Sequence, residues 1–230
     1  MITSHIYCGI TMDKFTVLSM FITFVTSNDV LKFIPHDKST QNTKPIQWTP
    51  PGFCNGLDCP PFIVGNETDE YQERFYAQST WVSTELLGID YDKAQYKMFM
   101  KLFKYIEGGN KKKMKIAMTC PVTTRIIPGQ GAACKSNFTM SFFIAGKVKN
   151  PPGPSEDDVR LRPQPALHVY VRSFGGYVHH FDEWREEAEK LIAALEKDGR
   201  EFEREYYYTA GYNAPFQLFN RHNEIWFIAK

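Results

Sequence analysis

The stretch Lys115-Ile-Ala-Met-Thr-Cys-Pro-Val-Thr-Thr124 decides the fold, together with the C-terminal run Tyr206-Tyr-Tyr-Thr-Ala-Gly-Tyr-Asn-Ala-Pro215. Both are rich in apolar, aromatic and β-branched residues and each contains a proline, so both predict strands bounded by turns. Neither contains a paired acid and base, a phosphate-binding loop or a cluster of metal ligands. The two stretches therefore indicate a protein that holds a molecule on an apolar surface rather than one that catalyses a reaction.

One order of elements, β-α-β-β, occurs twice around these stretches. Periodicity and turn residues predict strands near 71–76, 79–87, 115–127 and 137–144, and again near 167–173, 205–212 and 223–229. One helix is predicted from an N-cap at Asp90 to Glu107, and a second over 181–197. Residues 147–165, rich in proline and acid, predict a loop. Two such units predict one α+β domain over residues 66–230, with both helices outside a curved antiparallel sheet or barrel.

The first helix is apolar over more of its circumference than packing on one sheet requires. Its charged residues fall on a narrow ridge of lysines at positions 93, 97, 101 and 104. A helix that covers a sheet needs an apolar stripe of roughly 100°, and this helix has about twice that. The excess lines a ligand cavity, contacts a partner, or is covered by the proline-rich segments, and the sequence leaves these three alternatives open.

The N-terminus has the pattern of a secretory leader. Lys14 precedes the apolar run Phe15 to Val25 and the small residues that follow it, so residues 1–27 are predicted to be a signal peptide, with Met12 as an alternative start. The run is too short to be a transmembrane helix. Residues 28–65 contain six prolines and predict an irregular lead-in. We therefore expect a secreted, extracellular protein with no transmembrane span.

The cysteines and glycosylation sequons agree with secretion. Removal of the leader removes Cys8 and leaves four cysteines, an even number suited to an oxidising compartment. One candidate disulfide joins Cys120 and Cys134, which flank a predicted hairpin. A second joins Cys54 and Cys59, which would close a short loop. Crossed pairings of the four cysteines stay open. The two sequons predict a glycoprotein, and they lie at Asn66 and Asn137.

Several segments together resemble the SOUL / heme-binding protein family. They are Trp81-Val-Ser-Thr84, Gly108-Gly-Asn110, Met114-Lys-Ile-Ala-Met-Thr-Cys-Pro-Val-Thr123, Val171-Arg-Ser-Phe-Gly-Gly176, Tyr207-Tyr-Thr-Ala-Gly-Tyr-Asn213 and Asn220-Arg-His-Asn-Glu-Ile-Trp226. The resemblance runs from about Tyr71 to Lys230. It implies a distorted antiparallel β-barrel made of two β-α-β-β halves with two flanking helices. It also implies non-catalytic binding of heme or another tetrapyrrole, or of a similar flat apolar molecule, as a carrier or scavenger.

Two departures from the family concern the cofactor and the cysteines. Relatives can carry a histidine, proposed as an axial heme ligand, where this chain has Phe75, and phenylalanine cannot coordinate iron. Alanine is common in the family where this chain has Cys120. If iron is coordinated here, His179 and His180 before the second helix are the candidate ligands, since neutral imidazole is a competent axial ligand.

A porphyrin could also be held by contact with the first helix. Burial of a large apolar ring contributes several kcal/mol at about 25 cal/mol per Å² before ordering costs. Cationic side chains would bind its propionates through charge-assisted hydrogen bonds. The candidate ligand-binding residues are apolar Met98, Phe99, Leu102 and Phe103, with cationic Lys97, Lys101 and Arg172.

Other function classes have less support. A net charge of +1 gives no electrostatic reason to expect nucleic acid as a partner. No nucleophile and base have a spacing that suggests an enzyme. The alternative is a protein-interaction module that kept the fold and lost heme, with an unidentified protein partner. The stripe around Leu191 and Leu195 on the second helix would be its docking surface, although such a stripe more commonly packs on a sheet.

Overall fold

The computed structural model describes residues 48–131 and 134–230. The elements in chain order are the 3-10 turn η2 (Gly52–Cys54), β1 (Phe62–Glu67), β2 (Gln72–Tyr76), β3 (Ser79–Gly88), α1 (Tyr91–Ile106), β4 (Val122–Ile127), β5 (Ser136–Ile144), β6 (Val159–Gln164), β7 (Leu167–Phe174), α2 (Phe181–Lys197), β8 (Tyr207–Gly211) and β9 (Asn223–Ile228). The predicted signal peptide and most of the predicted lead-in lie outside the described residues. Among the described helices, none combines the length and the hydropathy that a bilayer crossing requires.

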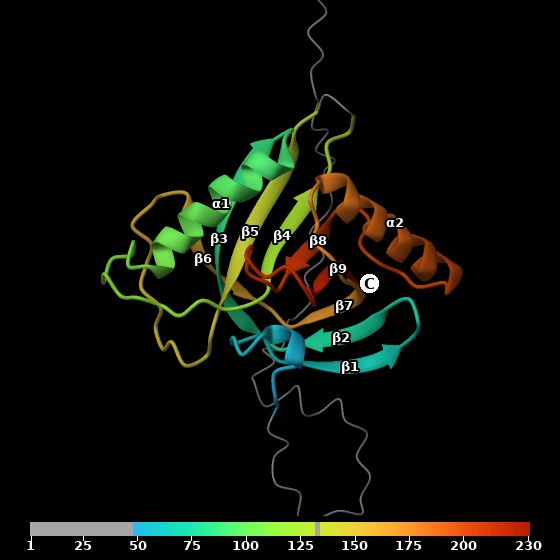
Figure 1. The fold of residues 1–230 in the computed structure, drawn as a ribbon, viewed down its shortest axis with the longest axis horizontal. Helices are drawn as coiled ribbons and strands as arrows, with labels where there is room; N and C mark the ends of the chain where they lie inside the picture. The colour runs from blue at the N-terminus through green and yellow to red at the C-terminus, as the bar shows by residue number, and fades with distance from the viewer. Residues whose placement is uncertain (1–47, 132–133) are drawn as a thin grey trace, which may run out of the picture.

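The nine strands form one curled antiparallel sheet in the order β1-β2-β7-β9-β8-β4-β5-β3-β6 (Figure 1). The order shows the predicted repeat: β3-α1-β4-β5 and β7-α2-β8-β9 occupy equivalent places on either side of the β4–β8 pair. Strands β6 and β2 then extend the two halves in the same way, by pairing with β3 and β7. The predicted α+β fold, a distorted barrel with two flanking helices, is confirmed.

Both helices pack on one face of the sheet, which we call the outer face. Helix α1 lies over β3 and β5, and α2 lies over β7 and β9 (Figure 1). Period-2 alternation directs one set of strand side chains toward the helices and the other set to the opposite, inner face. The outer-face core joins buried residues of α1 and α2 to Phe142, Ile225 and Phe227 of the strands.

Three segments differ from the sequence prediction. The strand expected near 115–127 is confined to β4, and residues 115–121 lie outside any strand. The lead-in expected to be irregular up to residue 65 contains η2 and the start of β1, and the segment 147–165 expected to be a loop contains β6. A proline argues against a strand in sequence analysis because it has no backbone N–H to donate to the hydrogen bonds between strands. Strand β6 accommodates Pro163 because it is an edge strand that pairs only with β3.

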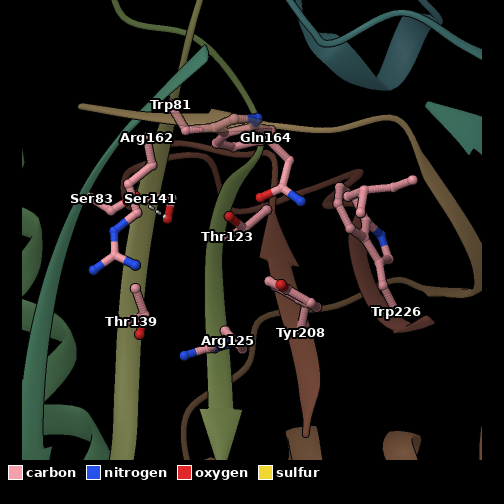
Figure 2. Close-up of a pocket in the computed structure, with 11 residues that line it drawn as sticks. Trp81, Ser83, Thr123, Arg125, Thr139, Ser141, Arg162, Gln164, Tyr208 and Trp226 are labelled. Carbon is pink, nitrogen blue, oxygen red and sulfur yellow. Dashed lines mark hydrogen bonds between the residues drawn. The ribbon is translucent and has the colours of Figure 1, made fainter. Parts of the chain in front are cut away.

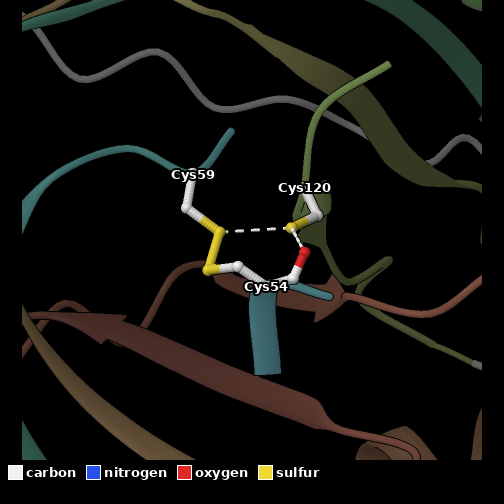
Figure 3. Close-up of side chains that lie close together, drawn as sticks. All are labelled: Cys54, Cys59 and Cys120. Carbon is white, nitrogen blue, oxygen red and sulfur yellow. Dashed lines mark hydrogen bonds between the residues drawn. A yellow bond between two sulfur atoms is a disulfide. The ribbon is translucent and has the colours of Figure 1, made fainter. Parts of the chain in front are cut away.

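The described end of the lead-in, from Trp48 onward, packs against the inner face, where three cysteines lie together (Figure 3). Cys54 and Cys59 form a disulfide, as the short-loop prediction had it. Cys120 lies beside them, with its Sγ 3.1 Å from that of Cys59, and its thiol donates to the Cys54 carbonyl oxygen. The predicted Cys120–Cys134 disulfide is wrong, because the β-strand pairing carries Cys120 into this cluster instead. Burial raises the pKa of the Cys120 thiol to about 12, an effect reinforced by the charges of Glu224 and Asp58.

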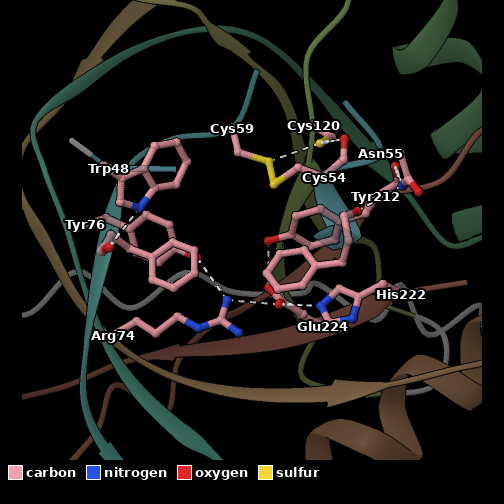
Figure 4. The surroundings of a disulfide bond; sticks show 12 residues. Trp48, Cys54, Asn55, Cys59, Arg74, Tyr76, Cys120, Tyr212, His222 and Glu224 are labelled. Carbon is pink, nitrogen blue, oxygen red and sulfur yellow. Dashed lines mark hydrogen bonds and ion pairs between the residues drawn. A yellow bond between two sulfur atoms is a disulfide. The ribbon is translucent and has the colours of Figure 1, made fainter. Parts of the chain in front are cut away.

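A buried ion pair adjoins this cluster (Figure 4). Glu224 is fully buried and Arg74 is 2% exposed, and their carboxylate and guanidinium are 2.9 Å apart. The same carboxylate accepts hydrogen bonds from Tyr212, Trp226 and His222 at 2.6–2.8 Å. Burial alone raises the pKa of Glu224, but Arg74 and the hydrogen bonds outweigh it and hold the pKa well below its usual range. The inner face is thus closed at this end by a satisfied polar network.

Candidate functional site

A groove lies on the outer face of the sheet between α1 and the start of α2. Its cavity volume is about 390 Å³, which lies within the range of pockets that bind organic ligands. Its lining mixes polar residues, including Asp92 and Thr124, with apolar side chains from α1, the sheet and the start of α2. The apolar side chains are Phe99 and Met100 of α1, Val122 and Met140 of the strands, Val178, and Trp184 of α2.

Local sequence signals set the two helix starts that border the groove. Asp90 caps α1 as predicted, since its carboxylate accepts from the Lys93 amide at 3.0 Å. At α2 the Glu183 carboxylate accepts from the backbone amides of His179 and His180 at 2.8 and 2.9 Å. The pKa of Glu183 is lowered mainly by these two amide hydrogen bonds. Both histidines are thereby fixed at the groove wall.

The predicted ligand-binding residues of α1 divide between the core and the groove. Met98 and Leu102 are buried against the sheet at 1% and 0% exposure. Phe99 lines the groove, and Phe103 stacks on it at a ring-centroid distance of 5.9 Å while remaining 38% exposed. The apolar excess of α1 is therefore explained in part by the groove, whose lining also includes Tyr96 and Met100.

The predicted cationic residues lie away from the groove lining. Lys97 is exposed. Lys101 forms an ion pair with Asp158. Arg172 of β7 bridges Glu70 and Glu187 at 2.6 and 2.8 Å. The two carboxylates already satisfy much of the Arg172 guanidinium, so a ligand would have to displace them.

Arg221 is a cationic groove residue that the sequence analysis did not identify. Its Nη1 donates to the carbonyl oxygens of Ala214 and Gln217, and its guanidinium lies 4.4 Å from the centre of the Tyr177 ring. The Arg221 Nε is buried without a hydrogen-bond partner among the described residues. The loop between β8 and β9 positions this arginine, which lies in the Asn220–Trp226 segment of the family resemblance but was not identified there as a binding residue.

His179, His180 and Arg221 meet at the groove, whereas Phe75 does not line it. Phe75 stacks on His168 of the neighbouring strand β7, with ring centroids 4.3 Å apart, and His168 is held by Glu73 at 2.6 Å. Phe75 therefore lies away from the groove and its two imidazoles. An apolar wall with imidazoles and a guanidinium is a donor set that fits a porphyrin with propionates.

Comparisons with known proteins agree with this architecture. The model of the SOUL heme-binding protein family matches residues 57–228. Heme-binding protein 2 of Homo sapiens is 40% identical over 171 residues, covering 74% of this chain and 83% of the relative. Heme-binding protein 1 of Xenopus tropicalis is 30% identical over 159 residues, covering 69% and 83%.

A solved structure shares the fold at low sequence identity. The C-terminal domain of EcmrR superposes with a TM-score of 0.53 at 13% identity, and the match covers 70% of this chain and 98% of that domain. At this identity the likeness concerns the fold alone.

Proposed function

Because this chain belongs to the SOUL heme-binding protein family, we propose that the groove between α1 and α2 binds heme or a related tetrapyrrole without catalysis, as a carrier or scavenger. One observation supports this most directly: His179, His180 and Arg221 line a groove of about 390 Å³ that also contains several apolar and aromatic side chains. Phe99, Met140 and Trp184 would contact the ring, Arg221 would bind a propionate, and one of the two histidines would face the iron.

The loop between β8 and β9 adds apolar surface near the same groove. Its residues Asn213, Pro215 and Arg221 belong to the groove lining, and its tip exposes Phe216, Leu218 and Phe219 at 86%, 67% and 80%. Three large apolar side chains in succession on a loop tip are costly to leave in water. We propose that they supply further contact area to the bound macrocycle.

Titration of the full chain with hemin, followed by Soret absorbance, tests the proposal. We expect a saturable, red-shifted Soret band. Phe99→Asp should weaken binding at least tenfold, because it places a carboxylate in the apolar wall. Ile89→Asp is the matched control, since Ile89 is 65% exposed and outside the groove lining. A titration no different from that of an unrelated protein, or equal affinity in the Phe99 and Ile89 variants, would refute groove binding.

Ligation by histidine is tested separately. The double variant His179→Ala/His180→Ala should lose the Soret shift while it keeps residual affinity from ring contacts. An unchanged spectrum would show that neither histidine coordinates iron.

The interaction-module alternative has less physical support. Leu191 and Leu195, the proposed docking stripe of α2, are both 0% exposed and pack in the outer-face core. Docking of that stripe on a partner would require α2 to detach from β7 and β9. We therefore propose ligand binding in preference to protein capture.

We also propose that the chain is secreted and glycosylated. The Cys54–Cys59 disulfide suits an oxidising compartment, and Asn66 is exposed on β1. Asn137 of β5 donates to the Glu85 carboxylate at 2.5 Å, so a glycan there would compete with that contact. Expression in a secretory host, with N-terminal sequencing and glycosidase treatment, distinguishes a processed glycoprotein from an unprocessed chain.

A further inference from the structure

A second pocket lies on the inner face of the sheet, on the side away from the helices (Figure 2). It is a shallow pocket with a cavity volume of about 80 Å³, so a bound ring would lie partly in solvent. Strand register places its residues in adjacent rows: Ser83, Ser141 and Thr123 in one, and Thr139, Arg125 and Tyr208 in the next. Arg162 of β6 reaches into the same space from beside Trp81.

The pocket contains polar groups that the protein itself leaves unsatisfied. Thr139 is only 8% exposed, yet its Oγ1 has no hydrogen-bond partner among the described residues. The buried Nε of Arg125 likewise has none within the described ranges. Buried polar atoms are normally paired, so each exception is costly. Because Arg125 and Thr139 both line the pocket, their unsatisfied atoms point to an acceptor that is supplied from outside.

The charge of the pocket favours an anion. Arg125 and Arg162 both line it. The Arg125 guanidinium faces the Tyr206 ring at 5.3 Å, while Arg162 has Glu85 at 3.8 Å. Two guanidinium charges and one carboxylate charge leave the pocket cationic by one charge, which matches a monoanion.

The remaining walls favour a flat ring. Trp81, Tyr208 and Trp226 line the pocket from β3, β8 and β9, and Figure 2 shows their rings around the polar rows. Aromatic walls bind planar ligands by stacking and edge contacts. The Ser83 and Ser141 hydroxyls, 2.8 Å apart, add donors and acceptors on the floor.

We propose that the inner face is a second binding site, separate from the helix-side groove, for a small aromatic carboxylate. Arg125 and Arg162 bind the carboxylate, Thr139 donates to it, and the aromatic walls hold the ring. The site shares no lining residue with the groove. A test of this site is therefore independent of whether the groove binds heme.

Isothermal titration of the full chain with 2-naphthoate tests this site. We expect saturable binding, with 2-naphthamide, the uncharged isostere, at least tenfold weaker. 2-Naphthyl phosphate is the comparison anion: binding equal to or tighter than the carboxylate would overturn the carboxylate assignment. No binding of 2-naphthoate, or equal binding of acid and amide, would overturn the site.

Variants locate the binding. Arg125→Gln should weaken 2-naphthoate at least tenfold and leave hemin binding unchanged. Arg185→Gln, a charge-matched change on the exposed face of α2, should have no effect. Phe99→Asp should also leave 2-naphthoate affinity unchanged. Loss of affinity in Phe99→Asp together with retention in Arg125→Gln would assign the binding to the groove and refute the proposal.

A nearly isosteric variant guards against misfolding of the arginine variant. Thr139→Val removes the orphaned hydroxyl without changing the shape of the side chain, so the fold should be kept, as measured by circular dichroism and Tm. We expect 2-naphthoate affinity to fall at least threefold. Unchanged affinity in a folded Thr139→Val variant would show that this hydroxyl does not meet the ligand, contrary to the proposal.

Discussion

Substitution of Glu224 by glutamine should destabilise the protein more than most single changes. The Oε1 of Glu224 accepts from Arg74 at 2.9 Å and His222 at 2.6 Å, and its Oε2 accepts from Tyr212 at 2.8 Å and Trp226 at 2.7 Å. Whichever oxygen becomes an amide nitrogen, that nitrogen then faces an N–H donor that cannot accept, from Arg74 at one position or Trp226 at the other. Arg74 also becomes a buried cation without a counter-charge. Removal of one partner of such a pair costs about 3–5 kcal/mol.

Urea unfolding followed by tryptophan fluorescence, without reductant, measures this loss. Glu186→Gln is the matched control, because Glu186 is exposed on α2, and we expect a change within about 0.5 kcal/mol. Arg74→Met should cost less in the Glu224→Gln background than in the wild-type protein, since the cation is already unpaired there. A loss below about 1 kcal/mol for Glu224→Gln, or additive effects of the two changes, would refute the reasoning.

The same network predicts how stability depends on pH. The pKa of Glu224 is lower in the folded state than in the unfolded state, because the attraction of Arg74 and the hydrogen bonds outweighs burial. Its contribution is therefore present above the ordinary glutamate pKa of about 4.3 and is lost as pH falls toward the folded value. We expect wild-type stability to fall below about pH 4, and to fall less steeply in Glu224→Gln. Parallel pH profiles would contradict this assignment.

Four further variants test the packing. Thr84 is 2% exposed and its Oγ1 has no partner among the described residues, so Thr84→Val should raise the free energy of unfolding by about 1–3 kcal/mol. Thr209→Val removes the hydrogen bond to Tyr91 and should lower the free energy of unfolding. Changes of the same sign in the two variants would contradict this reasoning. Cys54→Ala/Cys59→Ala should lower the free energy of unfolding by about 2 kcal/mol, the chain-entropy value for a loop this short. Reductant should lower the stability of the wild-type protein by the same amount, so the difference between wild-type and variant should then disappear. Leu191→Ala should cost about 2–5 kcal/mol in urea unfolding because it leaves a cavity under α2, and a cost near zero would show that α2 is not held by this stripe.

Local signals were enough to predict the two helices and most of the strands in their repeated order. The second helix has the predicted bounds, Phe181–Lys197, and Asp90 caps the first. Capping and periodicity depend on neighbours a few residues apart, so a sequence carries them directly. Strand β6 was not predicted because it contains Pro163, and a strand tolerates proline mainly at the edge of a sheet. Whether a strand lies at the edge depends on the order of the whole sheet, in which β6 is the last strand.

Contacts made across the sheet could not be predicted in the same way. Cys59 and Cys120 are 61 residues apart, and only strand order brings Cys120 to the lead-in rather than to Cys134. On α1 the broad apolar face made Met98 and Phe99 equally good candidates for ligand contact. The direction of the sheet then buries Met98 and leaves Phe99 in the groove. Arg221 was missed because its place depends on the path of the loop between β8 and β9.

The two faces of the sheet separate what this chain can bind. On the outer face, the gap between two helices leaves a broad apolar groove. On the inner face, the lead-in covers the end near Arg74 and Glu224 and leaves the polar end open. Trp226 belongs to both parts of the inner face: its Nε1 donates to Glu224, its ring stacks on Tyr76 at 5.0 Å, and it also lines the open pocket. The network that stabilises the closed end therefore also fixes one wall of the pocket. It follows that loss of the Cys54–Cys59 disulfide, which secures the lead-in, should disturb the inner pocket before it disturbs the groove.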